Sequence, residues 1–137
     1  MSPAAALDWL ESLESFFYEF AEGYAAPFCT IKDFLRRKES SEDVKSSYPL
    51  GLKPAPLWDM LPFPVVRAMQ LGLKDFSRKL KGYESGILLG LESKTSAPVQ
   101  VLRQAGGLCE GFRNLFLAGE GSGFAGGIIS SGADGIR

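Results

Sequence analysis

The chain has 137 residues, of which 45% are hydrophobic and 23% charged, and its formal net charge is -1. This length suits one ordinary domain or two small lobes, and the composition is typical of a globular protein. A near-neutral charge gives no electrostatic reason to expect binding to nucleic acid or to an anionic membrane. The longest apolar stretches are too short to span a bilayer, and the N-terminus lacks the features of a signal peptide, so we expect a cytoplasmic protein.

Histidine is absent, and the two cysteines, Cys29 and Cys109, lie far apart in the sequence. Without histidine the chain cannot hold a Ser-His-Asp triad, a Cys-His dyad or a histidine general base. Two isolated cysteines also lack the spacing of a zinc site or a disulfide framework. We therefore predict no histidine-based catalysis and no metal site, so the chemistry would come from a cofactor, from carboxylates or lysines, or from elsewhere. We name no catalytic residue in the chain.

The first part of the chain predicts helices. Residues 7–20 carry apolar side chains at steps of three and four, which is the pattern of an amphipathic helix. A second, short helix is expected to begin at Thr30, because Thr30 and Asp33 have the spacing of a capping box. Residues 38–47 are polar and predict an exposed loop.

The clearest helical pattern covers residues 65–80, after a proline-rich extended segment around residues 49–56. Its apolar side chains recur at steps of three and four and predict a stripe that faces the core. This stripe consists of Val66, Met69, Leu73, Phe76 and Leu80. Basic residues load the last turns, where positive charge complements the helix dipole.

The character of the sequence changes after about residue 85. Residues 87–91, 98–102 and 115–118 predict short strands, and residues 128–136 predict a helix. Ten of the sixteen glycines lie at or beyond Gly106. We therefore predict an α+β fold, with a helical lobe over residues 1–85 and a small lobe of strand, glycine-rich loop and helix over residues 86–137.

The glycine-rich loop carries the strongest chemical signal. Gly121, Gly123 and Gly126 match the dinucleotide fingerprint G-x-G-x-x-G, placed after a predicted strand and before a predicted helix. A complete nucleotide-binding unit needs a second strand and an acidic residue about 20 positions further on. Only eleven residues follow Gly126, so we reject a free-standing Rossmann unit.

Three interpretations of this loop remain open. Bare backbone can approach a ligand closely, and the free N–H groups at a helix start favour negative charge, so the loop suits contact with a cofactor. It could instead be a tight packed turn in a non-enzymatic, self-associating interaction module. It could also serve a small phosphate- or nucleotide-binding module through residues 121–127. Five glycines within residues 119–127 exceed what packing alone needs, which favours ligand contact.

A series of motifs gives the chain a family resemblance. They are Ser47-Tyr48-Pro49, Leu57-Trp58-Asp59-Met60-Leu61-Pro62, Gly72-Leu73-Lys74-Asp75-Phe76, Gly90-Leu91-Glu92-Ser93-Lys94-Thr95-Ser96-Ala97-Pro98-Val99, the run from Leu117 to Ile128, and Asp134-Gly135-Ile136-Arg137. In these motifs the chain resembles FAD-dependent dehydrogenases of the type described as NAD(FAD)-utilising, which are relatives of glutathione-reductase-like flavoproteins. The resemblance is close over about two thirds of the chain and loose over the first third.

The resemblance implies a set of cofactor-binding residues. In such flavoproteins a strand followed by Gly-Asp or Gly-Glu returns near the C-terminus and completes the flavin site. Here Gly119 and Glu120 would lie beside the ribityl–pyrophosphate region, with Glu120 accepting a hydrogen bond from a ribityl hydroxyl. The amides from Gly126 to Ile128 would face the pyrimidine edge of the flavin. The full implied set is Gly119, Glu120, Gly121, Ser122, Gly123, Phe124, Ala125, Gly126, Gly127 and Ile128.

Two hydroxyl residues, Thr95 and Ser96, belong to another motif of the resemblance. They are expected either at the substrate side of the flavin or at a strand entry where their hydroxyls bond local backbone.

The nucleotide-binding front half of these flavoproteins has no counterpart in the sequence. We therefore expect a C-terminal fragment of an FAD-dependent oxidoreductase, with NAD(P)H as a candidate electron donor. Residues 1–85 would belong to its cap or substrate domain and residues 86–137 to its FAD-binding domain. Alone, the chain is expected to be inactive, to retain no FAD and to self-associate through faces meant for the absent N-terminal portion.

Overall fold

The computed structural model describes residues 3–41, 44–91, 93 and 97–136. It contains helices and one small mixed sheet, which confirms the predicted α+β fold. The chain forms two compact units, one of Glu14–Leu91 and one of Met1–Leu13 with Glu92–Arg137. The assignment of residues 1–85 and 86–137 to a cap domain and an FAD-binding domain stays a prediction.

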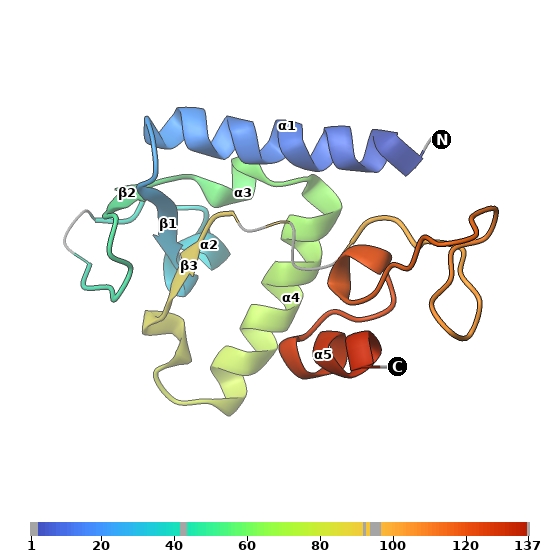
Figure 1. Cartoon of the computed structure of the whole chain (residues 1–137). Coiled ribbons are helices and arrows are strands. Elements are labelled where there is room, and N and C mark those ends of the chain that lie inside the picture. The colour runs from blue at the N-terminus through green and yellow to red at the C-terminus, as the bar shows by residue number, and fades with distance from the viewer. Residues whose placement is uncertain (1–2, 42–43, 92, 94–96, 137) are drawn as a thin grey trace. The chain divides into compact units, whose positions relative to one another are not determined.

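The sheet of the first unit is centred on the buried strand β1 (Ala26–Thr30). Strand β2 (Leu52–Pro54) pairs with it in parallel, and β3 (Ile87–Leu89) pairs with it in antiparallel orientation, which gives the order β2-β1-β3 (Figure 1). The sequence predicted a strand at 87–91, and β3 confirms its start. β1 and β2 were not predicted, because prolines at positions 27 and 54 remove ladder donors and mark extended or turn segments.

Most of the helices follow the sequence prediction. α1 spans Pro3–Ala21, α2 Ile31–Arg36, α3 Leu57–Met60, α4 Phe63–Lys79 and α5 Ile128–Ile136, with short 3-10 turns at Tyr83–Ser85 and Glu120–Ser122. The predicted helices at residues 7–20, 65–80 and 128–136 are confirmed as α1, α4 and α5. None of the helices among the described residues combines the length and apolar character needed to cross a bilayer.

The start of α2 shows the predicted cap. The Thr30 hydroxyl oxygen accepts the Asp33 amide hydrogen at 3.0 Å, and the hydroxyl donates to the Asp33 carboxylate at 2.7 Å. The buried Ser40 hydroxyl also donates to this carboxylate at 2.7 Å and accepts the Thr30 amide hydrogen at 2.9 Å. Thr30 therefore caps α2 as expected, but only half of the capping box forms, because Ser40 and not Asp33 accepts the Thr30 amide hydrogen.

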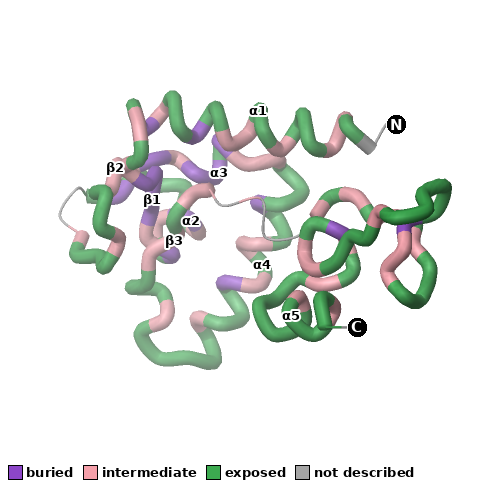
Figure 2. The backbone as a smooth tube through the Cα atoms, viewed as in Figure 1, coloured by how far each residue is buried: buried purple, intermediate pink, exposed green. Residues whose placement is uncertain are grey.

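The core lies between β1 and the helices α2, α3 and α4. Phe28, Phe34, Leu57 and Val66 are almost completely buried there, and Figure 2 shows how densely buried residues gather in this part of the chain. The predicted stripe of α4 is right for Val66 and Leu73, which are buried. It is wrong for two residues of the last turns, Phe76 and Leu80, of which about half the surface is exposed.

The exposure of these last two residues follows from the sizes of the elements. A helix of 17 residues extends over about 25 Å. Strands of three to five residues cover only about 10 to 17 Å, so they cannot line its full length.

Two other predicted strands, 98–102 and 115–118, do not form. Their surroundings contain only isolated bridges, Arg103 with Cys109 and Leu108 with Phe116. Leu102 and Phe116 are mostly exposed, and among residues 97–136 only Cys109 and Ser122 are buried. The prediction was wrong because an apolar, strand-like sequence becomes a strand only when a neighbouring strand accepts its backbone hydrogen bonds, and this unit provides none over these residues.

Candidate functional site

The glycine loop, defined here as residues 119–127, runs from an extended segment into α5. Gly119 has φ 79° and ψ −160°, and Gly123 has φ 80° and ψ 11°, so both adopt backbone conformations that other L-residues avoid. Between them the Ser122 side chain turns inward: it is buried, and its hydroxyl donates to the Gly119 carbonyl at 2.6 Å. The loop is therefore a defined turn.

Only some glycines of the loop are required by the fold of the chain itself. A Cβ atom at Gly123 would collide with the backbone of residues 99 and 100, lying 2.7 Å from the Gln100 Cα atom. This close approach is held by the Val101 amide, which donates to the Ser122 carbonyl at 3.0 Å. At Gly121, in contrast, an added Cβ would meet nothing within 4 Å, and the backbone has no positive φ. Packing within the chain therefore requires glycine at position 123, whereas no contact within the described part of the chain requires glycine at position 121.

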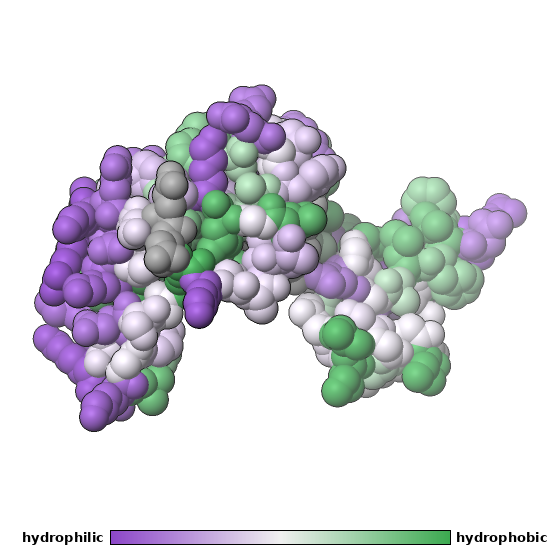
Figure 3. Space-filling view, turned by 90° about the vertical axis from the view of Figure 1, so that its left-hand side faces the viewer, coloured by the Kyte–Doolittle hydropathy of each residue, from purple (hydrophilic) through white to green (hydrophobic). Residues whose placement is uncertain are grey.

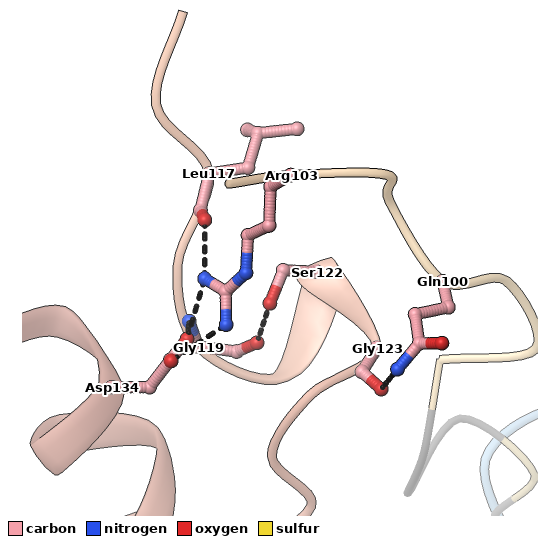
Figure 4. A network of polar contacts seen from close by, with 7 residues as sticks. All are labelled: Gln100, Arg103, Leu117, Gly119, Ser122, Gly123 and Asp134. Atoms are coloured by element: carbon pink, nitrogen blue, oxygen red, sulfur yellow. Dashed lines mark hydrogen bonds and ion pairs between the residues drawn. The ribbon is translucent and has the colours of Figure 1, made fainter. Parts of the chain in front are cut away.

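An ion pair holds the entrance of the loop (Figure 4). The Arg103 guanidinium donates two parallel hydrogen bonds to the Asp134 carboxylate of α5, at 2.6 and 2.9 Å. The side chains of Arg103 and Asp134 are only 9% and 15% exposed. The hydrogen bonds to Asp134 raise the pKa of Arg103, so the guanidinium stays charged.

The same two side chains bind the backbone on both sides of Ala118. The Gly119 amide donates to the Asp134 carboxylate at 2.8 Å, and Arg103 also donates to the Leu117 carbonyl at 2.7 Å. The Phe124 ring covers the guanidinium, with 3.9 Å between the ring centroid and the Arg103 Cζ atom. One carboxylate and one guanidinium therefore link three segments of this unit.

The amides of the loop fall into two groups. Gly119 donates to Asp134 and Gly127 donates to the Ser130 hydroxyl at 3.1 Å, so these two amides are satisfied within the chain. The amides of Ile128 and Ile129 find no acceptor among the described residues. These two residues are 95% and 87% exposed, so the first turn of α5 presents free N–H groups to the surroundings.

A pocket of about 330 Å³ lies beside the ion pair. It is lined by Phe116 and Leu117 before the loop, by Phe124 within it, and by Asp134 and Gly135 of α5. These α5 residues belong to the last turn of the helix, so the pocket adjoins the entrance of the loop and the helix end.

The carboxylate of Glu120 makes no hydrogen bond or ion pair within the described part of the chain, and the residue is half-buried. It is therefore available as an acceptor. The two residues expected at the substrate side, Thr95 and Ser96, lie outside the described residues.

Arg103 and Asp134 were not predicted from the sequence as residues of the site. A signal for Asp134 was present: apart from Glu120, it is the only charged residue between positions 114 and 136. It lies near the C-terminal end of a helix, where the helix dipole disfavours a negative charge. A carboxylate in that position indicates a cation close to it in space.

The buried thiol of Cys29 and clusters of metal-ligating side chains are further candidate sources of reactivity. Burial raises the pKa of Cys29 to about 12, with the nearby Asp33 charge adding to the effect, so this thiol stays protonated at neutral pH. No cluster of three or more potential metal ligands of the His, Cys, Asp or Glu type occurs among the residues with defined positions.

The chain is similar to known proteins in two comparisons. A protein of Clostridium beijerinckii, described as an uncharacterized protein, is 38% identical over 141 residues, which cover 99% of this chain but only 26% of that relative. The chain therefore spans about a quarter of the length of this relative. A family model described as "FAD-dependent protein, C-terminal domain-like" matches residues 1–95, which include the loosely resembling first third and exclude the glycine loop. With more than half of its length matched, the chain belongs to the family of FAD-dependent proteins with this C-terminal domain.

Proposed function

We propose that this chain is the C-terminal part of an FAD-dependent oxidoreductase, here called the parent protein, and that the glycine loop completes its flavin site. The family membership supports a flavoprotein, and the Clostridium relative has almost three quarters of its length outside the matched region. That remainder offers room for the nucleotide-binding unit that the chain lacks. The more specific dehydrogenase activity, with NAD(P)H as electron donor, belongs to the same proposal.

The residues of the loop fit the edge of a flavin in three respects. The free amides of Ile128 and Ile129 and the positive end of the α5 dipole suit the negative charge that gathers near N1 of a reduced flavin. Gly121 leaves open space where a side chain would stand, so a ring or a ribityl chain can approach the backbone. The Glu120 carboxylate can accept a hydrogen bond from a ribityl hydroxyl. FAD, when bound, would supply the hydride or electron transfer.

Within the set from Gly119 to Ile128 we propose different roles for different residues. The amides of Gly119 and Gly127 already have acceptors in the chain, so these residues would shape the loop rather than donate to the cofactor. Ser122 and Gly123 bind or pack against other parts of the loop and residues 99–101. Direct contacts would then fall to Glu120, Gly121 and the first turn of α5. Thr95 and Ser96 remain candidates for the substrate side.

The observation that carries the proposal is Gly121, a bare position that the chain's own packing does not require, in a loop that ends in open helix amides. The test compares the chain with the parent protein. After incubation with micromolar FAD and gel filtration, the chain alone should elute without flavin, because most cofactor contacts would lie in the absent portion. The parent protein should elute yellow.

Two results would contradict the proposal. A stoichiometric yellow chain would show that the chain is a self-sufficient flavin module. Genomic DNA upstream of Met1 without an in-frame G-x-G-x-x-G segment would remove the proposed parent.

A further inference from the structure

The Arg103–Asp134 ion pair differs from a typical surface ion pair in its burial and in its hydrogen bonds to the backbone. Both side chains are largely buried, although burial of charges is costly unless they are paired and fully hydrogen-bonded. The carboxylate accepts hydrogen bonds from two nitrogen atoms of Arg103 and from the Gly119 amide. The guanidinium adds a fourth bond, to the Leu117 carbonyl. The polar groups of the pair are thus directed at the backbone that enters the glycine loop.

The contact with Gly119 fixes the conformation of the loop at its first residue. Gly119 lies in a backbone region open almost only to glycine, and its amide and carbonyl are both held, by Asp134 and by Ser122 respectively. Rotation about this residue would re-aim every amide between it and α5. Because Asp134 itself sits on α5, the helix and the loop entrance are tied to one another by a single side chain (Figure 4).

Such a tie matters because the loop has few side chains of its own. Five of its nine residues are glycines. A glycine loses more conformational entropy on ordering than any other residue. A loop that first became ordered on binding would weaken the affinity for its ligand, whereas a loop held in place beforehand would not. The ion pair provides this preorganisation from outside the loop.

We propose that Arg103 and Asp134 are positioning residues of the flavin site, which hold the Gly119 backbone so that the free amides of α5 meet the cofactor. The inference rests on the proposed function, because it assumes that FAD lies against this loop. Neither residue touches the cofactor. Asp134 acts through the Gly119 amide, and Arg103 acts through Asp134 and the Leu117 carbonyl.

The test uses the parent protein with Asp134→Ala, Asp134→Asn and Arg103→Met variants. Asp134→Ala should weaken FAD binding by about tenfold or more and change the visible circular dichroism of the flavin that remains bound. Asp134→Asn should restore part of the loss, because the amide oxygen can still accept the Gly119 hydrogen. Asp75→Asn is the matched control, since it breaks an exposed ion pair with Lys79 by the same chemical change.

A purely structural role predicts another pattern. The thermal midpoint would fall, while the flavin bound to the variant would keep the wild-type spectrum and affinity. That result would overturn the inference and leave the proposed function intact. A second measurement, hydrogen exchange of the Gly119 amide in the chain itself, should show faster exchange in Asp134→Ala than in Asp134→Asn, and equal rates would also overturn it. A wild-type parent protein that binds no FAD would overturn the proposed function and this inference with it.

Discussion

At the scale of single residues, the glycines of the loop separate into positions that packing explains and positions that it does not. Gly123 combines a positive φ with a backbone neighbour where its Cβ would stand, so the folded chain demands glycine there. Gly121 has neither feature. The two positions are two residues apart, which makes them a matched pair for mutation.

We expect Gly121→Ala and Gly123→Ala to differ in two measurements. Gly123→Ala should destabilise this unit by about 2 kcal/mol, because it adds backbone strain and overpacking, and the Val101 amide should exchange faster with solvent. Gly121→Ala should leave that exchange rate unchanged in the chain, yet lower the FAD affinity of the parent protein. Wild-type FAD affinity in Gly121→Ala would mean that the flavin does not approach this backbone.

The capping network of α2 predicts a pH effect at another single residue. Burial opposes the ionised form of Asp33, but hydrogen bonds from the Thr30 and Ser40 hydroxyls, with the charges of Lys38 and Lys32, outweigh it and hold the pKa of Asp33 below its usual value. The unfolded chain has a pKa of about 3.9 at this carboxyl. The stabilisation is therefore present above about pH 4 and is lost as the pH falls through the lower, folded pKa.

We expect Asp33→Asn to lower the free energy of unfolding by about 1 kcal/mol at pH 7 and to flatten its decline below pH 4. Urea titrations at a series of pH values measure both effects. Asp75→Asn, at an exposed i,i+4 ion pair, should cost less than about 0.5 kcal/mol at neutral pH. Parallel pH curves for wild type and Asp33→Asn would show that this carboxylate does not contribute to the acid sensitivity.

At the scale of elements, the sequence predicted what local patterns determine. α1 and α4 have sustained apolar periodicity, and α2 has the Thr30–Asp33 cap. α5 has small and apolar residues suited to a helix, so each of these four helices could be located from the sequence. β1 and β2 could not, because they contain prolines and depend on partners far away in the chain. The strands expected at 98–102 and 115–118 did not form for the related reason that no strand pairs with them in the part of the chain that the structure describes.

The candidate site also combines a feature that local sequence determines with one that depends on residues far apart in the chain. The glycine loop could be found from spacing alone, since its signal lies within a few consecutive residues. The Arg103–Asp134 pair could not, because it joins positions 31 residues apart through a turn that the sequence does not reveal. Local chemistry could thus be predicted from the sequence, whereas the side chains that organise it became visible only in the structure.

At the scale of the whole molecule, large apolar side chains remain uncovered. Figure 3 shows hydrophobic groups reaching the surface in separate places among hydrophilic ones. On α5, Ile128, Ile129 and Ile136 are 95%, 87% and 89% exposed, and the helical rotation of 100° per residue places them within one stripe about 100° wide. A stripe of this kind is typical of a helix face that packs against another surface.

In the proposed parent protein this stripe would pack against the absent N-terminal portion, and without that portion a second copy of the chain can cover it. Burying one isoleucine contributes roughly 1.5 to 3 kcal/mol, but α5 is only about 14 Å long, so the contact stays smaller than a stable dimer interface. We therefore expect weak, concentration-dependent self-association of the chain alone. Sedimentation velocity across a wide range of protein concentrations measures it.

Two variants distinguish association through the α5 stripe from nonspecific hydrophobic association. Ile129→Ser should shift the chain toward monomer, because it removes one of the three exposed isoleucines of the stripe. Leu71→Ser, which changes a side chain 65% exposed on α4, should leave the association unchanged. Equal effects of both variants would point to nonspecific hydrophobic contact. A wild-type chain that stays monomeric at every concentration would mean that the exposed isoleucines of α5 need no partner. The proposal that the absent N-terminal portion covers this helix would then lose its support.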